Sequence, residues 1–127
     1  SQTIKTDFNE ILLDAYNANP SSMEQALKSF ALNKKNPRLV ILGDMRELGI
    51  HSEKSHSMIA GLCHELALDA IFVGEAFKAV AKDNSTGRFY ASVKELISEI
   101  EGGEIKGKNI LLKGSRGMAM ERLLPLL

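Results

Sequence analysis

The amino-acid sequence predicts an α/β fold: a Rossmann-like, three-layer α/β/α sandwich with a mostly parallel sheet and an antiparallel strand at its N-terminal edge. Short apolar runs alternate along the chain with segments of helical periodicity, which is typical of parallel strands joined by crossover helices. Near the N-terminus, extended segments at residues 2–5 and 10–16 are joined by a polar turn. That turn is too short for a crossover, so the two segments must pair antiparallel. We expect residues 1–127 to form one domain.

The remaining elements follow from local signals. Ser21 with Glu24, and Ser92 with Glu95, form the capping-box pattern that starts a helix. Apolar residues at helical spacing follow each cap, and Gly102 ends the second of these helices. We predict further strands at residues 38–44, 70–73, 88–91 and 109–113. We predict helices at residues 21–33, 52–68, 76–82 and 92–101, and a terminal helix after residue 117.

The composition argues against several broad classes of protein. Lys plus Arg and Asp plus Glu number 16 each, so the formal net charge is zero. A general binder of nucleic acid or of anionic membranes would need a basic excess. No apolar run approaches the length that spans a bilayer, and no signal-peptide pattern opens the chain. The single Cys63 lies on the apolar face of a predicted helix, so we expect it in the core and expect the protein in the cytoplasm.

Three polar clusters follow the carboxyl ends of predicted strands, at residues 14–20 (DAYNANP), 43–45 and 114–117. Parallel strands bring such ends to one edge of the sheet, where open α/β folds bind ligands. The first cluster suits a ligand loop and equally a tight turn, because Asn and Asp also bond their own backbone. The last cluster combines a hydroxyl, a guanidinium and a predicted helix N-terminus, all able to bind anions, and it also fits a plain connecting loop. Spacing alone leaves both interpretations open.

Other motif-like features favour structural roles. Residues 102–109 (GGEIKGKN) come close to a phosphate-binding loop, but Asn109 replaces the hydroxyl that would hold Mg²⁺, and the segment precedes a strand instead of following one. A charged helix-to-strand turn fits this segment better. His51, His56 and His64 lack the spacing of a zinc helix, so we expect them at solvent-facing helix positions. We expect no metal site, and no catalytic residue in this chain by itself.

Taken together, the three clusters resemble a known family. The segments at residues 14–20 (DAYNANP), 42–49 (LGDMRELG) and 113–118 (KGSRGM) are similar to motifs in the C-terminal domain of the Mur ligases, in the same order and with compatible spacing. The resemblance covers essentially the whole chain, and the motif sequences are most similar to those of the members that add D-alanyl-D-alanine. It implies that residues 1–127 are the C-terminal domain of a larger, three-domain, ATP-dependent ligase of peptidoglycan precursor synthesis.

The resemblance also implies a reaction and its partners. In such ligases ATP phosphorylates the carboxylate of a UDP-N-acetylmuramoyl-tripeptide, and the amine of D-Ala-D-Ala attacks the acyl phosphate. The central domain holds the phosphate loop and most of the Mg²⁺ ligands, while the C-terminal domain closes over it with nucleoside and acceptor contacts. This chain carries no phosphate loop and no domain for the UDP-sugar. We therefore expect it to be inactive alone and to meet the tripeptide only through the missing domains.

The nucleotide contacts that the resemblance implies come from two strand ends. Asp14 matches the acidic position that binds the ribose, and a carboxylate suits two vicinal hydroxyls. Asp14→Asn is expected to lose less than Asp14→Ala, because an amide oxygen still accepts. Tyr16, Asn17 and Asn19 fall in the loop that faces nucleotide and substrate, with their roles undivided. Asp44, on the neighbouring strand end, would shape the same nucleotide cleft.

The acceptor contacts follow in the same way. Ser115 and Arg116, with Asn19, match the loops expected near the acceptor dipeptide, whose carboxylate suits the forked guanidinium of Arg116. The plain alternative is that Arg116 only pairs with a surface carboxylate such as Glu121, five residues on.

Two other functions remain open. A ligase of the same superfamily with another amino-acid acceptor, such as a glutamate-adding or folate-polyglutamate enzyme, would share most of the pattern. A stand-alone, non-catalytic α/β binding module would share the fold alone. The sequences at residues 16–20 (YNANP) and 114–118 (GSRGM) favour the D-Ala-D-Ala ligase. The gene upstream of Ser1 separates these functions, because only a ligase would carry a phosphate loop and an ATPase-type domain there.

Overall fold

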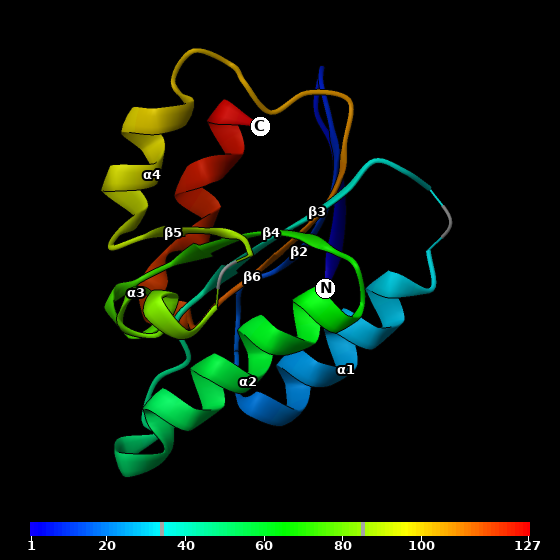
Figure 1. The fold of residues 1–127 in the computed structure, drawn as a ribbon. Coiled ribbons are helices and arrows are strands. Elements are labelled where there is room, and N and C mark those ends of the chain that lie inside the picture. The colour runs from blue at the N-terminus through cyan, green and yellow to red at the C-terminus, as the bar shows by residue number, and fades with distance from the viewer. Residues whose placement is uncertain (34, 85) are drawn as a thin grey trace.

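A six-stranded sheet lies between two layers of helices in the computed structural model, which describes residues 1–33, 35–84 and 86–127 (Figure 1). The strands are β1 (Gln2–Lys5), β2 (Glu10–Asp14), β3 (Arg38–Gly43), β4 (Asp69–Val73), β5 (Arg88–Tyr90) and β6 (Asn109–Lys113). The α-helices are α1 (Pro20–Ala31), α2 (Ser52–Glu65), α3 (Glu75–Ala79) and α4 (Val93–Ile100). Short 3₁₀ helices cover Gly49–His51, Ala81–Asp83, Arg116–Met118 and Met120–Leu126.

The strand order is β1-β2-β6-β3-β4-β5, and it confirms the predicted fold class. β1 pairs antiparallel with β2, while every other neighbouring pair is parallel. The last strand of the sequence, β6, is inserted between β2 and β3. Since these three strands are parallel, the chain segments that follow them all emerge at the same edge of the sheet. The three polar clusters lie at that edge.

The core has two parts because alternate side chains of each strand face opposite sides of the sheet. In β3, Val40 and Leu42 pack against α1, α2 and α3, whereas Leu39 and Ile41 pack against α4 and the C-terminal 3₁₀ helix. Figure 1 shows the same division, with α1 and α2 on one side of the sheet and α4 with the red C-terminal helix on the other. Each such side chain contributes roughly 1.5–3 kcal/mol when it is buried. Burial on both sides explains the continuous apolar runs in β3 and β6.

Helix α1 begins earlier than the capping box at Ser21 predicts. Its N-cap is Asn19, whose side-chain oxygen accepts from the Ser22 N–H at 2.9 Å, while Ser22 Oγ accepts from the Asn19 N–H at 3.1 Å. Pro20 fills the first helical position, where its missing N–H costs nothing. The reciprocal pair is thus Asn19 with Ser22, and the prediction that paired Ser21 with Glu24 is wrong. At α4 the predicted cap is confirmed, with Ser92 Oγ accepting from the Glu95 N–H at 3.1 Å.

Two predicted helix ends also shift, for local backbone reasons. Helix α2 stops at Glu65, three residues early, because Ala67 adopts a left-handed conformation with φ of 56° and the Leu68 N–H returns to the Cys63 carbonyl. After β6 the predicted terminal helix is a pair of 3₁₀ segments, since Ala119 has φ of 53° and interrupts them. The second segment buries Met120 and Leu123, and the partly buried Met118 of the first packs against the same core.

The segment that resembles a phosphate loop connects α4 to β6, as predicted. Within it, the Gly107 N–H donates to the Phe8 carbonyl at 2.7 Å, and the Lys108 N–H donates to Asn9 Oδ1 at 3.0 Å. These bonds tie it to the β1–β2 turn. It therefore lies at the edge of the sheet where β6 begins, opposite the edge that carries the polar clusters.

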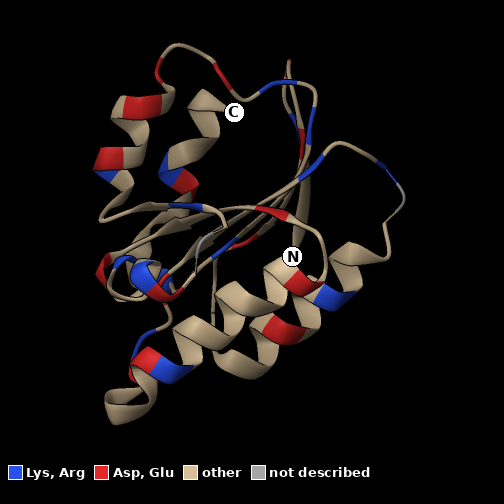
Figure 2. Cartoon of the chain, in the orientation of Figure 1, with Lys and Arg blue, Asp and Glu red and all other residues tan. Residues whose placement is uncertain are grey.

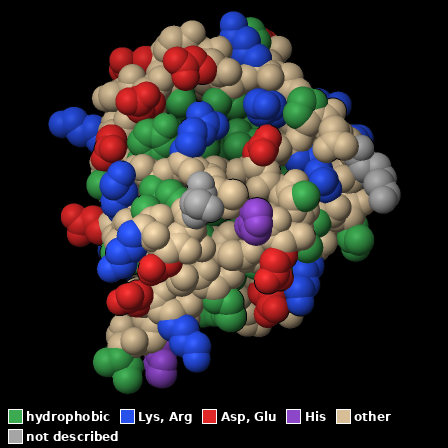
Figure 3. All heavy atoms as spheres, viewed as in Figure 1, with side chains coloured by type: hydrophobic (Ala, Val, Ile, Leu, Met, Phe, Trp, Pro, Cys, Tyr) green, Lys and Arg blue, Asp and Glu red, His purple; other side chains and the backbone are tan. Residues whose placement is uncertain are grey.

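Charges of both signs are spread over the outer layers. In Figure 2, acidic and basic residues occur on the helices of either side, and Figure 3 shows both signs interspersed with apolar side chains on this face. Within the described part of the chain, no helix combines the length and the apolar character that a membrane crossing needs.

His56 contradicts the prediction that the three histidines face solvent. Its ring is fully buried beneath the end of β3, although His51 and His64 are exposed. Nε2 accepts from the Met45 N–H at 3.0 Å, and Nδ1 lies 2.7 Å from the Ser52 carbonyl, which fixes Nδ1 as the protonated nitrogen. The ring also packs edge-on against Phe77. His56 therefore connects α2 to the segment that leaves β3.

We expect His56→Ala to destabilise the fold by about 1–3 kcal/mol, because the buried Met45 N–H loses its acceptor. The matched control is His64→Ala, an exposed residue two turns further along α2, which should lie within about 0.5 kcal/mol of wild type. Chemical denaturation of both variants measures the difference. Equal stabilities would show that the His56 bond contributes nothing.

The predicted core position of Cys63 is confirmed, since its side chain is buried in α2 and burial raises the pKa of its thiol to about 12. The thiol should therefore stay protonated and inaccessible at neutral pH, and a thiolate is the form that reacts. We expect negligible alkylation by iodoacetamide in the folded protein and complete alkylation in denaturant, measured by mass spectrometry. Rapid labelling under native conditions would contradict this burial.

Candidate functional site

The ends of β2, β6 and β3 meet at one edge of the sheet, as the sequence predicted. Ser115, which follows β6, is the residue that joins them. Its N–H donates to the Asp44 carbonyl at 3.2 Å, its Oγ accepts from the Arg46 N–H at 3.0 Å, and the same hydroxyl lies 3.5 Å from the Ala18 carbonyl. One serine thereby contacts the loops after β3 and β2.

Two glycines allow the ends of β3 and β6 to come this close. A Cβ atom on Gly114 would lie 3.0 Å from the Gly43 Cα and 2.8 Å from the Met120 side chain. A Cβ on Gly43 would lie 2.7 Å from the sulfur of Met120. A side chain at Gly114 would press on the backbone of Gly43 and on Met120, whereas one at Gly43 would displace the Met120 side chain. The glycines in two of the family-like motifs thus have a packing reason.

The segment after β3 is held by three different elements. The Asp44 N–H donates to the Val73 carbonyl of β4, the Met45 N–H to His56 of α2, and the Arg46 N–H to Ser115 after β6. The Asp44 carboxylate accepts from the backbone N–H groups of Ala76 and Phe77 at 2.9 and 3.0 Å. Both of its oxygens are thus used to start helix α3. Asp44 shapes the site by holding backbone in place, but the cleft that it lines is not the cleft that Asp14 lines, whereas the resemblance implies one nucleotide cleft for both.

On one side of this junction lies a cleft of about 490 Å³, which we call the Asp14 cleft. Asp14, Tyr16 and Arg116 line it, together with Leu13 and Glu121. The Arg116 guanidinium carbon lies 5.2 Å from the centre of the Tyr16 ring, a cation–π distance. Tyr16 is 74% exposed, so most of its ring remains available to a ligand. Three predicted residues from two separate motifs therefore share this cleft.

The Asp14 carboxylate forms an ion pair with a buried lysine, Lys113. Lys113, the last residue of β6, donates from Nζ to Asp14 Oδ2 at 2.9 Å and to the Asn17 carbonyl at 2.9 Å. Among the described residues, no group bonds the other oxygen, Oδ1. That oxygen is free to accept from a ligand.

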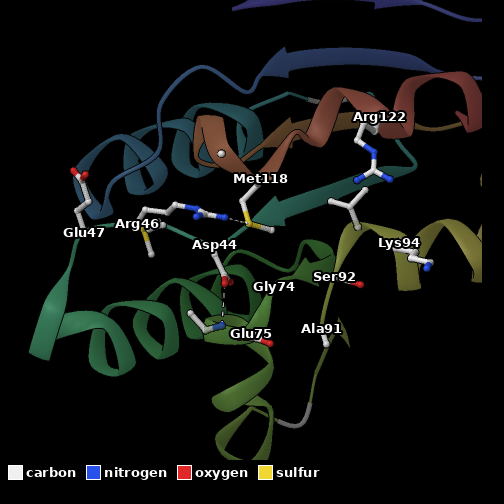
Figure 4. A pocket seen from close by; sticks show the side chains of 14 residues that line it. Asp44, Arg46, Glu47, Gly74, Glu75, Ala91, Ser92, Lys94, Met118 and Arg122 are labelled. Atoms are coloured by element: carbon white, nitrogen blue, oxygen red, sulfur yellow. Dashed lines mark hydrogen bonds between the residues drawn. The ribbon is translucent and has the colours of Figure 1, made fainter.

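On the other side lies a larger cleft of about 990 Å³, which we call the Arg46 cleft (Figure 4). Arg46 reaches across it toward Met118, with a guanidinium nitrogen 3.6 Å from the sulfur, while Arg122 and Lys94 approach from the far side. Asp44, Glu47 and Glu75 supply the acidic groups of the lining, so acidic and basic side chains are equal in number there. Within the described chain, none of the three cations forms an ion pair.

The predicted site residues thus divide into two groups. Asp14, Tyr16 and Arg116 face the Asp14 cleft, whereas the Asn19 side-chain oxygen caps α1 and the Ser115 hydroxyl is buried in the junction. Direct contact of Ser115 with a dipeptide, as the resemblance implied, would require these bonds to break. Asn17 is exposed and contributes its carbonyl to the bond from Lys113. In the described part of the chain, Arg116 makes no ion pair with Glu121, which was the plain alternative for this arginine.

Sequence reasoning missed Lys113 and the cations of the larger cleft. Lys113 and Arg46 both stood inside segments already singled out, but neither was assigned a role. The available signal for Lys113 was a charged residue that ends an otherwise apolar strand (NILLK), a position that is seldom charged without a partner. The described ranges contain no group of three or more His, Cys, Asp or Glu residues that could hold a metal ion.

Comparison with known proteins relates this geometry to a family. Residues 1–116 match the family model described as Mur ligase, glutamate ligase domain. The chain is 37% identical over 123 residues to the UDP-N-acetylmuramoyl-tripeptide--D-alanyl-D-alanine ligase of Treponema pallidum (strain Nichols). That match covers 91% of this chain and 27% of the relative, so the chain spans about a quarter of the relative's length.

Solved structures agree with the sequence match. A MurF crystal structure from Acinetobacter baumannii superposes with a TM-score of 0.82 at 28% identity, covering 98% of this chain and 28% of that one. The MurF ligase from Thermotoga maritima, solved in complex with ADP, superposes with a TM-score of 0.79 at 20% identity, covering 98% and 29%. This second likeness concerns the fold alone. With the family model matching most of its length, this chain belongs to the Mur ligase family, in the region that the family describes as the glutamate ligase domain.

Proposed function

We propose that residues 1–127 are the C-terminal domain of a three-domain, ATP-dependent ligase that adds D-Ala-D-Ala to a UDP-N-acetylmuramoyl-tripeptide. The observation that supports this proposal most directly is the Asp14 cleft. There a carboxylate oxygen, an exposed aromatic ring and a guanidinium meet at the edge where the parallel strands end. The relatives are ligases of this kind, which supports the proposed activity. They also favour it over a ligase with another acceptor and over a non-catalytic module. A cytoplasmic location would follow from these substrates.

The nucleotide is proposed to lie against the Asp14 loop. Asp14 Oδ1 can accept from ribose hydroxyls, and Tyr16 presents an exposed ring to a base or sugar face. The Thermotoga maritima MurF ligase was solved in complex with ADP, which supports the proposal that this domain contacts a nucleotide. We propose that Mg²⁺ is held mainly by the remaining domains, since the described residues contain no group of three or more His, Cys, Asp or Glu that could hold a metal ion.

For the acceptor, we propose that Arg116 binds the carboxylate of D-Ala-D-Ala. The reaction requires the free amine to reach the acyl phosphate, with the new amide replacing the bond to phosphate, while the far end of the dipeptide is anchored. A guanidinium next to the nucleotide contacts suits that anchor, because it binds a carboxylate through two parallel bonds. The role of this chain is to position both ligands; the phosphate chemistry would take place on the other domains.

Arg46 is a second candidate for the same anchor. It stands with Arg122 and Lys94 in the larger cleft, where the three cations lack ion-pair partners within the described residues and the Met118 side chain offers an apolar surface to a methyl group. The two arginines lie on opposite sides of the 115–118 turn. Their variants can therefore be compared directly.

In the full-length ligase, Asp14→Ala should raise KM for ATP by about one to two orders of magnitude, because a hydrogen bond to a charged acceptor contributes roughly 1.5–3 kcal/mol. KM for D-Ala-D-Ala should remain nearly unchanged. Steady-state kinetics with each substrate varied in turn makes the measurement. An unchanged KM for ATP together with a collapse of dipeptide binding would refute the ribose assignment.

For Arg116→Ala we expect a steep rise in KM for D-Ala-D-Ala with little change in KM for ATP or in melting temperature. Arg116→Lys should lose part of the effect, because it keeps the charge without the planar fork. The matched variant is Arg46→Ala. If Arg46→Ala shows the dipeptide defect and Arg116→Ala does not, the anchor belongs to the larger cleft. If Arg116→Ala only melts early, its role is structural.

A further inference from the structure

Lys113 is a buried lysine that the proposed reaction has not yet used. Its side chain is only 2% exposed, at the carboxyl end of the central strand β6. In the sheet register it stands beside Asp14 of β2 on one side and Leu42 of β3 on the other. Burying an ammonium group away from water costs several kcal/mol unless hydrogen bonds and an opposite charge compensate. The contacts of Nζ therefore indicate what this residue does.

Lys113 Nζ makes two hydrogen bonds within the described residues, and both go to the Asp14 loop. Nζ donates to Asp14 Oδ2 and to the Asn17 carbonyl, each at 2.9 Å. These acceptors lie at the two ends of the four-residue segment that contains Tyr16. A single rigid point on the central strand thus fixes the start and the end of the loop, including the carboxylate that faces the cleft.

The bond to Asp14 also decides which oxygen a ligand meets. Because Oδ2 accepts from Lys113, rotation of the carboxylate is restricted and Oδ1 is the oxygen available to a ligand. The Asp14 side chain is 31% exposed, so it remains accessible while Lys113 is not. A carboxylate held in this way need not be ordered when the ligand arrives, which removes an entropic cost from binding.

We propose that Lys113 is a positioning residue for the nucleotide, holding Asp14 Oδ1 and the Tyr16 loop in the conformation that binds the nucleoside. This inference rests on the proposed function, since it assumes that the Asp14 cleft takes a nucleotide. Lys113 acts through Asp14 and does not itself contact the nucleotide.

The proposal reverses an expectation drawn from the sequence. Asp14→Asn was expected to keep an accepting oxygen for the ribose. With Lys113 beneath it, the amide oxygen must turn to the ammonium group, because an NH₂ group there would face another donor. The NH₂ group of Asn is then left facing the cleft. Asp14→Asn should accordingly lose about as much nucleotide affinity as Asp14→Ala.

The test uses the full-length ligase with Lys113→Met, which keeps an unbranched side chain of similar length and removes the charge. We expect KM for ATP and Kd for ADP, measured by calorimetry, to rise by about ten-fold. KM for D-Ala-D-Ala and the melting temperature should be nearly unchanged. Lys108→Met is the matched control, because it removes a lysine next to the opposite end of β6 and should alter none of these values.

A double-mutant cycle separates positioning from general damage. If Lys113 acts through the carboxylate, Asp14→Asn combined with Lys113→Met should bind ADP no more weakly than Asp14→Asn alone, because the amide is then free to turn its oxygen to the ribose. Independent effects would instead multiply, which would overturn the proposal. Lys113→Leu, which likewise carries no donor, provides the same comparison if Lys113→Met does not fold.

The remaining outcomes are also decisive. If the wild-type enzyme binds ADP and Lys113→Met binds it with the same affinity, the positioning role is overturned. A parallel rise of KM for both substrates with early melting shows that Lys113 serves only the fold. The wild-type protein could also lack ligase activity but bind ADP, while Lys113→Met binds ADP more weakly. That result would refute the proposed ligase function and support the positioning role. If the wild-type protein binds no ADP, both proposals fail.

Discussion

The close approach of the ends of β3 and β6 is the constraint on which the rest of the site depends. A Cβ atom on Gly114 would lie 3.0 Å from the Gly43 Cα, and Ser115 then bonds to the backbone on both sides of the junction. Without this contact the loop after β3 would lose one of its three anchors. The turn that follows Ser115 supplies Arg116 to one cleft and Gly117 with Met118 to the other.

Around this junction, polar side chains fall into two kinds. One kind bonds to backbone groups and holds the loops: the Asp44 carboxylate starts α3, the Asn19 side-chain oxygen starts α1 and His56 supports the β3 loop. The other kind faces a cleft, as Asp14 and Arg116 do. The distinction lies in the partners that each group already has within the fold, because an oxygen that caps a helix is directed at the backbone of that helix.

This distinction explains how much the sequence could predict. Apolar runs and helix caps determine the layers, the parallel sheet and the antiparallel edge, and the order of strand ends places Asp14 near Arg116. Residue type alone does not tell whether Asn19 accepts from Ser22 or from a substrate, because both uses suit an amide in a loop. The Asn19–Pro20 start of α1 was missed because Ser21 with Glu24 also satisfies the capping pattern.

The buried groups were harder to predict for a similar reason. His56 lies on a helix whose other histidine, His64, is exposed, and only the tertiary position of Met45 gives its Nε2 a partner. Lys113 has its partner on a strand that is remote in sequence and adjacent only because β6 is inserted between β2 and β3. Local periodicity carries no information about such pairings, which depend on the strand order.

The short turn at residues 115–118 has a consequence for how this domain can change. Arg116 lines one cleft while Gly117 and Met118 line the other, so consecutive residues of a single turn serve two ligand surfaces. A substitution that shifts this turn alters both surfaces together. Selection for a new ligand in one cleft is therefore freest at the outer walls, at Tyr16 for the smaller and at Lys94 for the larger. The turn itself is the part of the domain least able to diverge.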